Sequence, residues 1–208
     1  LSIAESEYRI ALASEVRLLA EQSDRDTLAF PEILLDDVSP RVQAVVDVQQ
    51  RLFQVRRQSL KDALSALDEK ARQMEEQIAG LERLQQVNRS KINSLSGEAG
   101  DYRTLFKEGL GDNQRLRELE RQVLEYQGEN AQHSAEVAQL RSQISENGFQ
   151  KEIRRQEYHQ EVGEYLKDVQ SQVTDAEERV TALRDQVQRT AIVAPVSGTV
   201  VGLQVHTQ

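Results

Sequence analysis

The stretch Lys107–Gln114, KEGLGDNQ, interrupts a chain that is otherwise patterned for long helices. Within it, Gly109 and Gly111 flank Leu110, and Asp112 and Asn113 follow at once. A glycine just past the end of one helix, followed by Asp or Asn at the start of another, is the sequence signal for a helix stop and an immediate restart. The stretch therefore predicts a short turn at 109–112 between two helices.

The helical segments on either side, 40–108 and 113–190, are nearly equal in length and share one apolar pattern. Ser39-Pro40 is a favourable helix start, with Ser as N-cap and Pro at the first helical position. Beyond it, apolar residues recur in steps of three and four on both sides of the turn, with a slip near Asn88 and another at 146–150. Examples are Leu60, Leu64, Leu67, Ala71, Met74, Ile78 and Leu81 before the turn, and Leu116, Leu119, Val123, Tyr126, Val137, Leu140 and Ile144 after it. Matching seams joined by a short turn predict a long antiparallel coiled-coil hairpin.

The ends of the chain differ from the hairpin. Residues 1–20 have the apolar spacing of a first helix. Residues 21–39 contain Pro31, a Ser-Asp step and an Asp pair, and Pro40 follows them, so they predict an irregular connector. Residues 191–208 carry no charged side chain except His206, are rich in β-branched residues and contain a Pro195–Gly198 turn. They predict short strands. The expected fold class is mostly α, with a partial β-domain at the C-terminal end.

Composition excludes several classes of function. The chain has 29% charged residues, 4% aromatic residues, a formal net charge of −9 and no cysteine. The absence of cysteine excludes disulfides, thiol catalysis and cysteine-based zinc sites, and the absence of a basic block argues against nucleic-acid binding. No phosphate-binding loop or nucleophile motif is present, and the three histidines lie far apart. We therefore expect no enzyme activity, no catalytic residues, no metal and no cofactor.

Three seam positions are polar: Asn88, Asn130 and His133. Polar residues at such positions usually set the register of a coiled coil, and this is the favoured interpretation. The alternative makes His133 a pH switch or a ligand.

The C-terminal segment APVSGTVVGLQV resembles half of a lipoyl-like domain, although 191–208 contain no lysine that could bear a cofactor. A lipoyl half directly after a long helical hairpin resembles the periplasmic adaptors, or membrane fusion proteins, of bacterial export. The first helix, the connector and the very long hairpin resemble the type I secretion (HlyD-like) branch. The stretches LFKEGLGDNQRLRELERQV and APVSGTVVGLQVHT are most similar to the alkaline protease secretion adaptors.

This resemblance implies a non-catalytic link between an inner-membrane ABC transporter and a TolC-like outer-membrane channel. It implies a ring of copies, commonly six, that forms part of the export conduit, and an exported protease or lipase as cargo. The localisation would be periplasmic, in a protein anchored in the inner membrane. Leu1 is not a natural start, so we expect an excised segment, with the anchor outside it.

Adaptors of this kind often carry an Arg, a Leu and a Ser at set spacing near the turn. Here Leu105 and Asp112 occupy the Leu and Ser positions, and Arg103 lies two residues from the Arg position, which Asp101 fills. The residues expected to contact the channel are Arg103, Leu105, Gly109, Leu110 and Asp112. A purely structural interpretation makes Gly109 and Gly111 C-caps and Asp112 an N-cap.

Three other assignments stay open at this stage. A drug efflux adaptor would have a shorter hairpin and would lack the helix and connector at 1–39. A structural coiled-coil scaffold would form a parallel dimer of extended chains and would leave the turn unexplained. A carrier subunit of an enzyme is disfavoured because 191–208 contain no lysine.

Overall fold

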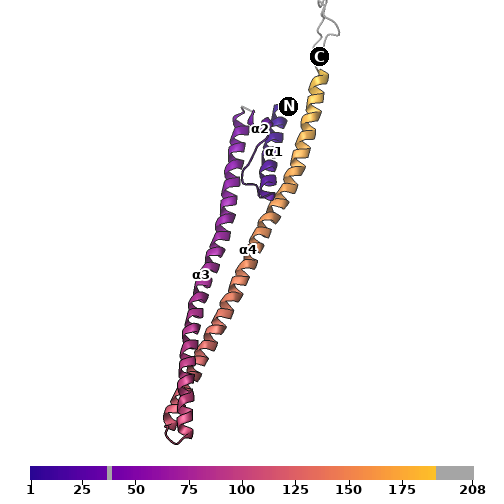
Figure 1. Cartoon of the computed structure of the whole chain (residues 1–208). Helices are drawn as coiled ribbons and strands as arrows, with labels where there is room; N and C mark the ends of the chain where they lie inside the picture. The colour runs from indigo at the N-terminus through magenta and orange to yellow at the C-terminus, as the bar shows by residue number, and fades with distance from the viewer. Residues whose placement is uncertain (37–38, 191–208) are drawn as a thin grey trace, which may run out of the picture. The chain divides into compact units, whose positions relative to one another are not determined.

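The computed structural model describes residues 1–36 and 39–190, and these contain four helices and no strand. The helices are α1 (Ser2–Gln22), α2 (Glu32–Leu35), α3 (Pro40–Lys107) and α4 (Asn113–Thr190), as Figure 1 shows. The half-lipoyl domain predicted at 191–208 lies outside the described residues. The described residues divide into two compact units, one formed by 57–158 and one by 1–56 with 159–190.

The predicted long helical hairpin is confirmed. Within the unit 57–158, side-chain contacts join α3 to α4 at positions whose numbers rise on α3 while they fall on α4. These contacts are Asp68–Lys151, Glu82–Arg141, Gln85–Ser134, Asn88–Glu129 and Glu98–Arg115. This order is possible only if the two helices are antiparallel.

The seam of this unit alternates between apolar and polar layers. Met74, Ile78 and Val137 are buried in it, as the three-and-four spacing predicts. Asn88 is also buried, and its Nδ2 donates across the seam to Oε2 of Glu129 at 3.1 Å. The register role of the polar positions stays a prediction.

Two neighbouring polar seam atoms lack a hydrogen-bond partner among the described residues. They are Oδ1 of Asn130 and Nδ1 of His133. Further along α4, Nδ2 of Asn147 also has no hydrogen-bond partner among the described residues. Nδ1 of His133 lies 3.9 Å from Oε2 of Glu136, one turn along the same helix.

In the other unit, α1 packs beside the first part of α3 and the last part of α4. Its contacts to α3 advance in the same direction on both helices, so α1 and α3 are parallel: Ser14–Gln49, Arg17–Gln49 and Glu21–Arg56. Its contacts to α4 run in opposite directions: Glu5–Arg184, Glu7–Arg179 and Asp24–His159. The helix α1 thus turns this part of the molecule from a two-helix into a three-helix arrangement.

The expectation of an irregular connector at 21–39 is only partly right. Helix α1 continues to Gln22, and α2 occupies Glu32–Leu35. The physical reason is Leu34, which is almost completely buried and packs in a core with Ala13 and Val42. Burial of one leucine is worth about 1.5–3 kcal/mol, which is enough to hold a single helical turn that local propensity would not.

Four charged side chains bridge all three long helices of this unit. The Glu21 side chain has no exposed surface, and its carboxylate binds Nη1 of Arg17 at 2.6 Å and Nε of Arg56 at 3.2 Å. Nη1 of Arg56 also contacts Oε1 of Glu161 on α4 at 3.1 Å. We call Arg17, Glu21, Arg56 and Glu161 the Glu21 cluster. Because a buried carboxylate needs such partners, the cluster joins α1 to the hairpin at one defined register.

Candidate functional site: the hairpin turn

The turn between the two long helices begins with a Schellman motif. The Gly109 N–H donates to the Phe106 carbonyl oxygen at 3.0 Å, and the Leu110 N–H donates to the Leu105 carbonyl oxygen at 3.0 Å. This pair of bonds terminates a helix when the residue past its end adopts a left-handed conformation. Gly109 does so, with φ of 78°. The C-cap interpretation of Gly109 is therefore confirmed.

Helix α4 starts from Asp112. Its Oδ1 accepts a hydrogen bond from the Gln114 N–H at 2.8 Å, and its carbonyl oxygen accepts one from the Leu116 N–H at 3.3 Å. Asp112 is thus the N-cap of α4. Gly111, by contrast, is not a C-cap: a Cβ at this position would lie 2.7 Å from the Phe106 backbone nitrogen. Glycine is needed there because the chain passes close to the end of α3.

Gly109→Ala is expected to destabilise the hairpin by about 1–2 kcal/mol, because a side chain is strained in the left-handed region. Urea unfolding followed by circular dichroism measures this loss. The matched control is Gly97→Ala, in mid-helix with open space around its Cβ position, which should stabilise by about 0.5–1 kcal/mol. Equal effects at the two glycines would contradict the assigned turn geometry.

Three apolar side chains are exposed at this turn, and we call Leu105, Phe106 and Leu110 the apolar tip. Leu110 is 78% exposed and Phe106 is 44% exposed. Sequence reasoning missed Phe106, because the heptad spacing places it in the seam. The seam ends with Ala99, Leu116 and Leu119, which form a buried core with Leu95 and Tyr102, and Phe106 lies beyond that core.

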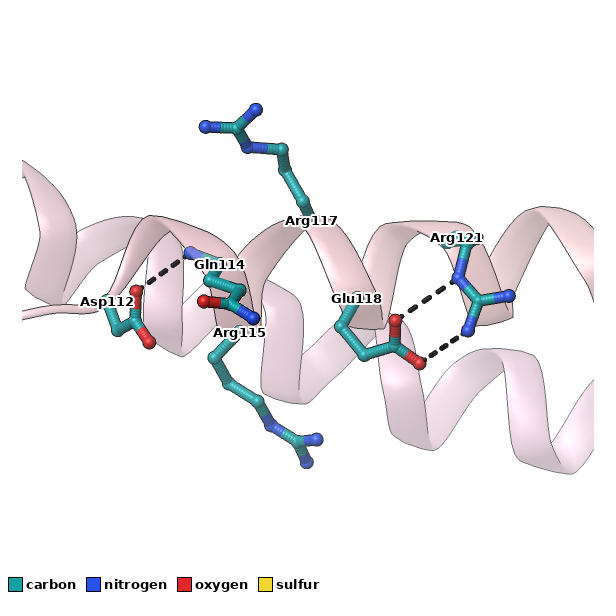
Figure 2. A pocket seen from close by; sticks show the side chains of 6 residues that line it. All are labelled: Asp112, Gln114, Arg115, Arg117, Glu118 and Arg121. Carbon is teal, nitrogen blue, oxygen red and sulfur yellow. Dashed lines mark hydrogen bonds and ion pairs between the residues drawn. The ribbon is translucent and has the colours of Figure 1, made fainter.

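Most charged side chains around the turn are paired within the hairpin. Nη2 of Arg103 lies 2.5 Å from Oε1 of Glu120, and Nη2 of Arg115 lies 2.8 Å from Oε1 of Glu98. Arg121 donates two hydrogen bonds to Glu118, drawn in Figure 2. The Arg121 bond lowers the pKa of the Glu118 carboxyl, and a bond from Gln122 adds to the effect. Arg103 is thus engaged inside the hairpin.

A shallow hollow opens beside the first turns of α4 (Figure 2). It is lined by Asp112, Gln114, Arg115, Arg117, Glu118 and Arg121. Its lining combines the N-cap of α4 with three guanidinium groups.

The structure brings four of the five predicted contact residues into one turn. Leu105, Gly109 and Leu110 are linked by the Schellman hydrogen bonds, and Asp112 follows as the N-cap. Arg103 lies earlier on α3 in its pair with Glu120. A role of these residues in binding a channel stays a prediction.

Within residues 1–36 and 39–190, no three His, Asp or Glu side chains are grouped as a metal site. Over the same ranges, no helix is long and apolar enough to cross a membrane.

Known proteins that resemble this chain are secretion proteins. A family model described as AprE, long alpha-helical hairpin, matches residues 1–186. The chain is 31% identical over 208 residues to the type I secretion system membrane fusion protein PrsE of Rhizobium meliloti, and 30% identical over 207 residues to the alkaline protease secretion protein AprE of Pseudomonas aeruginosa. These matches cover 100% and 96% of this chain but 47% and 46% of the relatives, so the chain spans about half their length.

A solved structure is also similar. The soluble domain of LipC, a membrane fusion protein of a type I secretion system, superimposes with a TM-score of 0.86 at 25% identity. The match covers 95% of this chain and 92% of that one. The likeness therefore extends over nearly the whole of both chains.

Proposed function

Because this chain belongs to the AprE long α-helical hairpin family of type I secretion membrane fusion proteins, we propose that it is the periplasmic hairpin of a secretion adaptor. The adaptor links an inner-membrane ABC transporter to a TolC-like outer-membrane channel. Its copies assemble in a ring around the path of the exported protein, and the resemblance to such adaptors implies six copies. We propose a protease or a lipase as cargo. Two relatives, AprE and the proteases secretion protein PrtE of Dickeya chrysanthemi, are named for protease secretion, which supports a protease.

The apolar tip is the single observation that best supports a contact with a channel. Its three side chains are exposed together at the turn, whereas other exposed apolar side chains, among them Leu124 and Phe149, lie along the two helices. Exposed apolar side chains grouped at one place indicate a surface that binds another protein. The Schellman bonds and the Asp112 cap hold the backbone beneath them, so the tip is ordered before it meets a partner.

The same observations disfavour the alternatives. A scaffold of parallel extended chains does not account for an antiparallel hairpin within one chain. An efflux adaptor is disfavoured because the matched family model begins at residue 1, and so includes the helix and connector that such adaptors lack. The relatives are named as secretion adaptors and not as enzymes.

A photo-crosslinking amino acid at position 110 of the full-length adaptor tests the proposal. In secreting cells it is expected to form a covalent adduct with the outer-membrane channel protein. The matched control is position 84 on α3, where Leu84 is also exposed but lies away from the turn. No adduct at position 110, or equal adducts at both positions, would refute the proposed contact.

A further inference from the structure

Three arginines, Arg115, Arg117 and Arg121, lie in the first nine residues of α4. Arg115 lies in its first turn, which contains no acidic side chain. The N-terminal end of a helix carries partial positive charge, so anions stabilise it and cations do not. The helix dipole therefore does not account for Arg115, and it has little effect on Arg117 and Arg121, which lie beyond the first turn.

Ion pairs explain two of the three arginines. Arg115 reaches across the hairpin to Glu98, and Arg121 is held by Glu118. Arg117 is different: it is exposed, and it has no hydrogen-bond or ion-pair partner among the described residues. Figure 2 shows its guanidinium group pointing away from Glu118 and Arg121.

The chemistry of a free guanidinium group limits what it can bind. Its fork of N–H donors matches a carboxylate, which it binds through two parallel hydrogen bonds. Arg117 lines the hollow at the start of α4, a few residues along the chain from Leu110 of the apolar tip. A partner that covers the apolar tip would also come near this hollow.

We propose that the hollow at the start of α4 receives an acidic side chain of the channel protein, with Arg117 as its ligand. This inference rests on the proposed function. The sequence predicts Arg103 as the charged residue that contacts the channel, but Arg103 forms an ion pair with Glu120. The present inference assigns that contact to Arg117 instead. Apolar contacts then supply affinity at the turn, while the charge pair supplies orientation and a dependence on salt.

The test compares Arg117→Glu with Arg117→Lys in the full-length adaptor, binding the purified channel protein of the same secretion system. Arg117→Glu is expected to weaken binding about tenfold and to flatten the dependence on salt between about 50 and 300 mM. Arg117→Lys should keep most of the affinity. The matched control is Arg83→Glu. Arg83 is also exposed but lies on α3, away from the turn, so this variant should bind like the unaltered adaptor.

Unfolding separates a binding defect from a folding defect. Arg117→Glu places an anion near the N-terminal end of α4, so its urea midpoint should be unchanged or higher. Binding by Arg117→Glu equal to that of Arg83→Glu, with the adduct at position 110 intact, would overturn this inference alone. Absence of the adduct at position 110 in the adaptor that keeps Arg117 would overturn the proposed function itself.

Discussion

Leu110→Lys is expected to abolish secretion while leaving the hairpin folded. Leu110 is 78% exposed and contributes only its backbone N–H to the turn, which any residue except proline supplies. The effect on stability should stay within about 0.5 kcal/mol, as for other exposed positions. A lysine ammonium pressed into an apolar interface loses its hydration, so contact with the channel should fail. Secreted substrate in the culture medium and helicity by circular dichroism are the two measurements.

Two further variants test the specificity of this result. Leu84→Lys makes the same change at an exposed leucine away from the turn, and secretion should continue. Asp112→Asn keeps a side-chain oxygen for the Gln114 N–H while removing the charge, so it separates capping from any charged contact at this residue. Normal secretion by Leu110→Lys would remove the apolar tip from the mechanism.

Glu21→Ala is expected to destabilise the unit formed by 1–56 and 159–190 by about 3–5 kcal/mol. The Glu21 carboxylate is completely buried between Arg17 and Arg56. Its removal leaves the buried Arg17 guanidinium without its carboxylate partner, and an uncompensated buried charge is costly. Helix α1 should therefore exchange its amide hydrogens much faster, while the unit 57–158 keeps its protection.

The control for this prediction is Glu7→Ala, which breaks an exposed ion pair with Arg179. Such pairs contribute about 0–1 kcal/mol, so the urea midpoint should hardly move. Glu21→Gln keeps the shape and one acceptor oxygen and should fall between the two. A loss at Glu21→Ala no larger than that at Glu7→Ala would show that the cluster does not hold α1.

The local and periodic features of this protein could be predicted without a structure. KEGLGDNQ contains its own stop and start signals, because Gly109 and Asp112 act on backbone groups only a few residues away. The apolar spacing of 40–108 and 113–190 predicts the seam, because a helix repeats its faces at a constant period. The hairpin and the residues of its turn follow from these two signals together.

The tertiary structure alone decided the features that join distant positions. Glu21 meets Arg56, and Arg56 meets Glu161, over separations of 35 and 105 residues, and no local pattern indicates such partners. Leu34 forms a helical turn only because Ala13 and Val42 bury it. Phe106 is exposed because it lies beyond the last buried layer of the seam. Gly111 is required because the chain passes close to the backbone at the end of α3. Sequence periodicity describes one helix at a time, whereas burial and charge pairing depend on which helices become neighbours.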